Sequence, residues 1–339
     1  MKNAWQRWGW PVLKGLLALA ILAAIGYRFY EDLWQLDRAH FELRPGWLVL
    51  SAVIYALGLW LAAWYWYHLL HICGDRPDLL TAGKGYFLGH LGKYVPGKAL
   101  ALLLRAGAVR GPHCRFGVAI ITSFYEVLTT MAAGGLFAAL VFAFDPPEVE
   151  GLPWHPVLTG LLLVALCGIP LLPGVFNFAV RKMAARFETV DAYQLPRLRL
   201  GTLIVGLLVT GIGWGLFGLS IWALLQGVVP HPPELSWHTW LRCSGTIGLA
   251  YVAGFLIVIL PGGLGVREGM LVPLLSFAGE RPVVAAAVLL LRVVWAGTEV
   301  LLAGALMLVR RRGATQVEPP VPDLGPHTEP GRLPDTARL

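Results

Sequence analysis

Long apolar runs recur along this sequence, and they constrain its fold more than any other feature. Runs of about 20 residues are long enough to cross the hydrocarbon core of a bilayer as helices. Lipid offers no hydrogen bonds, so spanning segments must pair all their own backbone groups, as helices and closed barrels do. The sequence therefore predicts an all-α, polytopic membrane protein, with spans near residues 15–26, 47–70, 116–144, 157–178, 200–225, 240–260 and 283–309.

The charged residues are few and lie mainly between the apolar runs. Only 14% of the 339 residues are charged, against roughly 25% in soluble domains. A net charge of +7 could suggest nucleic-acid binding, but basic loops between spans are what the positive-inside rule predicts. We therefore expect a membrane and its anionic lipids as partners, and no nucleic acid.

Loop charges also predict the topology. The predicted cytoplasmic side carries Arg110, Arg115, Arg181, Lys182, Arg186, Arg197 and Arg199, whereas the loops at 145–150 and 228–237 are acidic or neutral. Seven long spans would place the basic residues 310–312 outside, unless a broken segment such as 264–278 helps to complete an eighth crossing. We expect about 7–8 transmembrane helices in the inner (plasma) membrane with both termini cytoplasmic. Residues 1–312 would form the membrane domain, and 313–339 a disordered, Pro-rich cytoplasmic tail.

Two Pro-Gly motifs break the apolar pattern. One is Lys93-Tyr94-Val95-Pro96-Gly97-Lys98, and the other is Pro261-Gly262-Gly263-Leu264-Gly265. Proline removes a backbone donor and glycine permits positive φ, so a helix must end at each motif and leave its terminal groups unpaired. Inside a membrane such backbone survives only where protein buries it or where it lines a cavity. The motifs therefore predict two broken or re-entrant segments and a candidate binding site.

The two breaks share a longer pattern. Pro96-Gly97 is followed by Arg105 and Glu126, and Pro261-Gly262 by Arg267 and Arg292. The interval from the proline to the helix charge is almost the same in the two copies, as the differences 126 − 96 and 292 − 261 show. Paired interruptions in two halves are typical of transporter substrate sites, so the pattern indicates an internal repeat. Coincidence between two Gly-rich stretches is the alternative.

Charged residues within the apolar segments are the candidate site residues, because such charges are costly in lipid and must pair or line a polar cavity. They could be structural ion pairs between helices. Alternatively, arginines and new helix N-termini could hold an anionic head group that the carboxylates replace when the site is empty. The predicted substrate-binding set is Lys93, Pro96, Gly97, Lys98, Arg105, Glu126, Pro261, Gly262, Gly263, Gly265, Arg267, Glu268, Arg292 and Glu299.

No motif for catalysis, metal binding or a cofactor is found in the sequence. The nine histidines form no HExxH pattern, and the four cysteines lack metal-ligand spacing. The Gly262-Gly263-Leu264-Gly265 stretch lacks both the GxGxxG pattern and a GK[ST] ending. We therefore expect no cofactor, no metal and no catalytic residues.

The motif at 91–98, the glutamate at 126 and the motif at 260–268 together resemble the transmembrane, flippase-like region of lysylphosphatidylglycerol synthases and their stand-alone relatives. The resemblance covers about residues 10–310. It implies a protein that moves a lipid between leaflets. We expect a stand-alone member without the soluble synthase domain, and hence no lipid aminoacylation.

The resemblance leaves the lipid open, because stand-alone relatives also accompany glycolipid and polyprenyl-sugar pathways. The expected function is binding and translocation of an anionic phospholipid or a lipid-linked sugar. One alternative is a non-transporting accessory subunit of a membrane glycosyltransferase or glycolipid pathway, with that enzyme as partner. A second alternative is a membrane-embedded transferase.

Overall fold

The computed structural model describes residues 43–94, 98–147, 155–184, 198–256, 263 and 265–309, and these residues are helical without any β-strand. The first expected span (15–26) and the expected tail (313–339) lie outside the described residues. So do Pro96, Gly97, Pro261 and Gly262 at the two breaks.

The described helices follow the apolar runs closely. They are α2 (Pro45–Ile72), α3 (Leu79–Leu91), η3 (Gly92–Tyr94), α4 (Lys98–Val109), α5 (Phe116–Phe144), α6 (Pro156–Gly168), η4 (Ile169–Leu171), α7 (Pro173–Ala184), α8 (Leu200–Val228), α9 (Trp237–Leu256), α10 (Val266–Leu274), η7 (Ser276–Ala278) and α11 (Arg281–Leu308).

Four of these helices, α2, α5, α8 and α11, are long and apolar enough to cross a membrane. Each has 28 or 29 residues. Because an α-helix rises about 1.5 Å per residue, this length is enough to span a bilayer with some tilt. A fifth candidate is a bent pair of helices. The described residues thus supply four or five candidate spans, and the expected count of 7–8, the orientation and the inner-membrane location stay predictions.

The span expected at 157–178 is not one straight helix. It is divided into α6 and α7, which meet at 58°. Pro170 lies in the short η4 turn and Pro173 begins α7. Because proline cannot donate the backbone hydrogen bond of a helix interior and its ring clashes with the preceding turn, two prolines three positions apart end the helix and redirect the chain.

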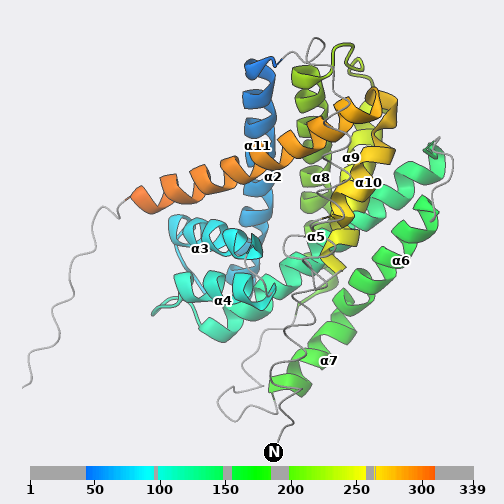
Figure 1. Ribbon diagram of the computed structural model, residues 1–339. Coiled ribbons are helices and arrows are strands. Elements are labelled where there is room, and N and C mark those ends of the chain that lie inside the picture. The colour runs from blue at the N-terminus through cyan, green and yellow to red at the C-terminus, as the bar shows by residue number, and fades with distance from the viewer. Residues whose placement is uncertain are drawn as a thin grey trace, which may run out of the picture.

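The long helices form one packed bundle (Figure 1). α8 packs against α2, α5 and α9, and α5 packs also against α6. The orange helix α11 runs obliquely across α2 and also contacts α3. The short helices α3 and α4 form a hairpin whose second arm packs on α5.

The α3–α4 hairpin is tightly closed because glycine faces the partner helix. A Cβ atom on Gly89 would lie 2.7 Å from the Cβ atom of Arg105 and 2.8 Å from the carbonyl oxygen of Ala101, closer than a side chain allows. The close approach brings Arg105 of α4 against α3, where its side chain is buried.

The two breaks occupy equivalent places in the order of elements. In the first, α3 and α4 flank the break and lead into the long helix α5. In the second, α9 and α10 flank the break and lead into the long helix α11. This order agrees with the pattern shared by the two Pro-Gly motifs.

Candidate functional site

The second break is shaped by glycines that precede α10. Gly263 and Gly265 have φ angles of 68° and 87°, a region that side chains with a Cβ rarely adopt. A Cβ atom on Gly263 would also lie 2.9 Å from the carbonyl oxygen of Gly254 on α9. The Gly265 N–H then donates to Oε2 of Glu268 at 2.5 Å, so a carboxylate satisfies a free backbone donor at the start of the helix.

Glu268 and Arg292 form an ion pair between α10 and α11. Glu268 is only 3% exposed, so the pairing offsets the cost of burying its charge. Beside this pair, the guanidinium carbon of Arg267 lies 3.4 Å from the centre of the Tyr251 ring on α9, a cation–π contact.

Both arginines keep hydrogen-bonding capacity. Arg267 Nε and Arg292 Nη2 are buried and have no hydrogen-bond partner among the described residues. A buried donor without a partner costs roughly 1–3 kcal/mol, and more when it is charged. Two such donors near one another suggest a place for an acceptor that neither arginine has within the described part of the chain.

The two arginines line a cavity of about 90 Å³. The third cationic residue on its wall is Lys93 of η3, and the remaining wall is aromatic or aliphatic: Tyr94, Tyr251, Leu271, Leu291, Trp295 and Ala296. Two carboxylates form ion pairs with these cations: Glu268 with Arg292, and Glu299 with Lys93. Three cations against two carboxylates leave one positive charge in excess among the described residues.

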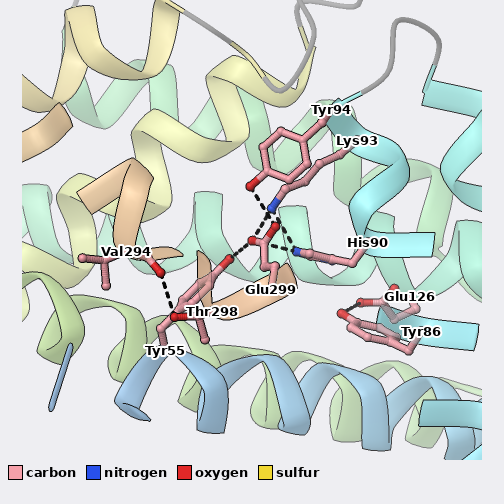
Figure 2. Close-up of polar contacts among 9 residues, drawn as sticks. All are labelled: Tyr55, Tyr86, His90, Lys93, Tyr94, Glu126, Val294, Thr298 and Glu299. Atoms are coloured by element: carbon pink, nitrogen blue, oxygen red, sulfur yellow. Dashed lines mark hydrogen bonds and ion pairs between the residues drawn. The ribbon is translucent and has the colours of Figure 1, made fainter. Parts of the chain in front are cut away.

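Glu299 lies at the centre of a second cluster (Figure 2). Lys93 Nζ lies 2.5 Å from its Oε1 atom, and Tyr94 donates to its Oε2 atom at 2.8 Å. Tyr55 of α2 donates to Oε1, and His90 Nε2 lies 3.4 Å from the same atom. Four side chains from α2, α3 and η3 therefore converge on one carboxylate of α11.

Sequence reasoning missed Tyr55, His90 and Tyr94 in this cluster. Tyr94 lies within the first Pro-Gly motif, directly after Lys93, and that position was the available signal. Tyr55 is an aromatic residue in the middle of α2, 244 positions from its partner. Nothing in the local sequence distinguishes it from the other aromatic residues of that helix.

Arg105 and Glu126 form a separate buried pair between α4 and α5. Arg105 Nη1 lies 2.6 Å from Glu126 Oε2, and the two side chains are 5% and 2% exposed. Tyr86 donates to Glu126 Oε1 at 3.4 Å and Thr130 does so at 3.1 Å. The Arg105 guanidinium carbon also lies 4.2 Å from the Tyr86 ring centre.

The structure thus divides the predicted site residues into groups. Lys93, Arg267 and Arg292 line one cavity. Glu299 and Glu268 are ion-paired to Lys93 and Arg292, and Gly263 and Gly265 lie at the break before α10. Arg105 and Glu126 bind each other and do not line the cavity. Lys98 begins α4, and the predicted Pro96, Gly97, Pro261 and Gly262 fall outside the described residues.

Arg242, near the start of α9, binds outside this region. It makes two hydrogen bonds to Asp145 of the α5–α6 connection, at 2.7 and 2.8 Å. His238 Nε2 lies 2.9 Å from the same carboxylate. The hydrogen bond from Arg242 lowers the pKa of Asp145 below its usual range.

The chemistry of the 90 Å³ cavity suits an anion. Arg267, Arg292 and Lys93 line a space whose other walls are aromatic or aliphatic, and guanidinium geometry matches phosphate or carboxylate oxygens. No group of three potential metal ligands occurs within the described ranges.

Comparison with known proteins identifies the family of the chain. A model of the lysylphosphatidylglycerol synthase TM region matches residues 12–304. No curated protein matches the chain. The family match covers most of the chain, including both breaks and all the charged helices of the site. The protein is therefore a member of the lysylphosphatidylglycerol synthase transmembrane region family, a membrane protein with several apolar helices.

Proposed function

We propose that this membrane protein binds the anionic head group of a lipid in the cavity between η3, α9, α10 and α11, and carries that lipid between leaflets. The observation that supports it best is that two buried guanidinium atoms, Arg267 Nε and Arg292 Nη2, have no hydrogen-bond partner among the described residues. A phosphate oxygen supplies the acceptor that both donors lack.

The charges around the cavity favour a ligand with a negative charge. One positive charge in excess remains after Glu268 and Glu299 are paired with Arg292 and Lys93. A single phosphodiester neutralises it, which matters because an uncompensated charge is costly at membrane depth. The acyl chains of the ligand would stay in the surrounding lipid.

The ion pairs offer a way to release the head group again. Lys93 and Arg292 can each bind a phosphate oxygen while Glu299 and Glu268 stay beside them, so the carboxylates still hold these two cations when the lipid leaves. The loaded and empty sites then differ only in the partner of Arg267. Small differences between states are what a carrier needs to turn over.

The break before α10 would supply the moving part. Gly265, whose φ is 87°, interrupts the helical backbone at the start of α10. This allows α10 to shift relative to α9 without breaking a continuous helix, and hinge motions are usually absorbed by a few residues of this kind. Arg267 and Glu268 lie in the first turn of α10, so any movement of that helix moves the site.

The test is transfer of head-group-labelled phosphatidylglycerol across the bilayer of proteoliposomes. Arg292→Lys keeps the charge opposite Glu268 but removes the second N–H of the fork, and Arg267→Lys removes the planar contact with Tyr251. We expect each to slow transfer by about tenfold or more, the effect of losing one charge-assisted hydrogen bond.

The matched control is Arg110→Lys, at an exposed position just after α4, which should leave the rate unchanged. Equal rates for wild type and both cavity variants, with all proteins folded, would refute the proposed site. Absence of lipid transfer by folded wild-type protein, with co-purification of a glycosyltransferase, would support the accessory role instead.

A further inference from the structure

We propose that His90 is a proton-binding site, and that a proton binds there together with the anionic head group. Such a site couples movement of the lipid to movement of a proton. This inference rests on the proposed function, because it adds a proton to the difference between the loaded and the empty anion cavity.

Glu299 of α11 joins the anion cavity to a second cavity (Figure 2). Two of its partners, Lys93 and Tyr94, line the anion cavity. The other two, Tyr55 and His90, line a cavity of about 60 Å³ among α2, α3, α5, α8 and α9. Side chains of the two cavities therefore meet at one carboxylate, and a change on one side can be felt on the other.

The contact between Lys93 and His90 requires a neutral imidazole ring. Lys93 Nζ lies 3.0 Å from His90 Nε2. A lysine ammonium can only donate hydrogen bonds, so Nε2 must accept with its lone pair. The ring then carries its proton on Nδ1 and has no charge.

A proton taken from water by Nε2 exchanges these partners. The lone pair forms the new N–H bond, so it no longer accepts from Lys93 and that hydrogen bond is lost. The new N–H can donate to Glu299 Oε1, which lies 3.4 Å from Nε2. Lys93, which lines the anion cavity, gains a donor for a phosphate oxygen. Protonation of His90 thus prepares the anion site.

Charge favours this proton when the anion is bound. Three cations and two carboxylates leave one positive charge in excess around the anion cavity. A proton on His90 alone raises this excess to two, whereas with one phosphodiester bound the excess is again one. Each of the two ligands therefore lowers the electrostatic cost of the other, and such coupling is reciprocal.

The other charges near His90 are already balanced in the described part of the chain. Arg105 and Glu126 form an ion pair, and the Tyr86 ring stacks on the His90 ring with centres 5.8 Å apart. The α8 residues of the second cavity are not ionisable. The ionisable groups that face or adjoin His90 are Tyr55 of α2, Tyr86 of α3, Lys93 and Tyr94 of η3, Arg105 of α4, Glu126 of α5, Tyr251 of α9 and Glu299 of α11.

His90 is the member of this group that is suited to take up a proton. The oxygens of Glu299 already accept from Lys93, Tyr94 and Tyr55, and tyrosine hydroxyls do not bind a further proton near neutral pH. Imidazole has an ordinary pKa of about 6.5, within the physiological range. The second cavity takes a few water molecules, which can deliver the proton to the ring.

The test is binding of head-group-labelled phosphatidylglycerol to purified wild-type protein between about pH 5.5 and 8. The phosphodiester keeps its single charge throughout this range. We expect the affinity to be about fivefold or more higher at the acidic end, the size of a typical coupling between sites. Binding near neutral pH should also take up protons, measured by calorimetry in buffers of different ionisation enthalpy.

His90→Gln locates the effect. The amide oxygen of glutamine can accept from Lys93, but it cannot bind a proton near neutral pH. The affinity of this variant should therefore be independent of pH, and its proton uptake should be close to zero. The matched control is His113→Gln, at an exposed position in the connection between α4 and α5, which should keep the behaviour of wild type.

The outcomes separate the two proposals. Binding to wild type with one affinity at every pH and without proton uptake would overturn the proton site and leave the anion site standing. Proton uptake that persists in folded His90→Gln would overturn the assignment to His90. Failure of the lipid to bind at any pH would refute the proposed function itself. His90→Asn gives the same comparison if His90→Gln does not fold.

Discussion

Replacement of Arg105 should destabilise the protein strongly, and replacement of its partner at the same time should restore much of the loss. Arg105 and Glu126 are 5% and 2% exposed, with 2.6 Å between Nη1 and Oε2. Arg105→Met leaves the Glu126 carboxylate buried without its cation, a change that costs about 3–5 kcal/mol in comparable pairs. In the double variant Arg105→Met/Glu126→Gln, the neutral amide needs no cation and can still accept from Tyr86 and Thr130.

The assay is thermal unfolding of the purified variants in lipid nanodiscs. At about 1.4 °C per kcal/mol for a chain of 339 residues, Arg105→Met should lower Tm by roughly 4–7 °C. The double variant should lie well above the single one, and the exposed Arg110→Met should match wild type. The double variant should also retain phosphatidylglycerol transfer, because neither residue lines the anion cavity. Strictly additive losses in Tm, or loss of transfer in a stable double variant, would refute the assignment of this pair as structural.

Three further predictions follow from the described geometry. Gly263→Ala should impair folding or lipid transfer, since it combines a φ of 68° with a 2.9 Å approach to the Gly254 carbonyl, whereas Gly269→Ala, which meets open space, should be tolerated in the same transfer assay. The Asp145–Arg242 contact should contribute its full stabilisation above the usual aspartate pKa, near 4. It should lose this effect as pH falls through the lowered pKa of Asp145 in the folded protein. A wild-type Tm as independent of pH in this range as the Tm of Asp145→Asn would contradict this prediction. Burial raises the pKa of the Cys114 thiol to about 12. Alkylation of this thiol by a maleimide near neutral pH should therefore be slow in the folded protein and fast after denaturation. Rapid labelling of the folded protein would argue against that burial.

The helices could be predicted well from the sequence because lipid imposes a simple requirement. A backbone in hydrocarbon must pair its own polar groups, so long apolar runs read directly as helices. The run at 116–144 coincides with α5, and those at 200–225 and 283–309 lie close to the bounds of α8 and α11. The run at 157–178 forms a candidate span that is bent by 58°, and the bend was not predicted because apolarity was given more weight than Pro170 and Pro173, which lack backbone donors.

The candidate site was predictable only in part. The costly charges Arg267, Glu268 and Arg292 could be picked out because each is rare within an apolar segment. Their partners could not be assigned, because pairing depends on helix packing. Arg292 and Glu299 lie two turns apart on α11, yet they bind different elements: Arg292 binds Glu268 of α10, and Glu299 binds Lys93 of η3.

A cavity of about 60 Å³ among α2, α3, α5, α8 and α9 left no local trace in the sequence. Tyr55, Thr130 and Thr210 come from three helices and are ordinary residues in membrane spans. Only the packing of α2, α5 and α8 brings their hydroxyls to one space, and the carboxylates behind Tyr55 and Thr130 fix which way those protons point.

The most direct measurement of the central claim is an experimental structure of the wild-type protein in nanodiscs that contain phosphatidylglycerol. We expect phosphate density within hydrogen-bonding distance of Arg267 Nε and Arg292 Nη2, with Lys93 close by. Well-resolved lipid head groups confined to the outer rim of the bundle, with the two arginines satisfied by other protein groups, would contradict it.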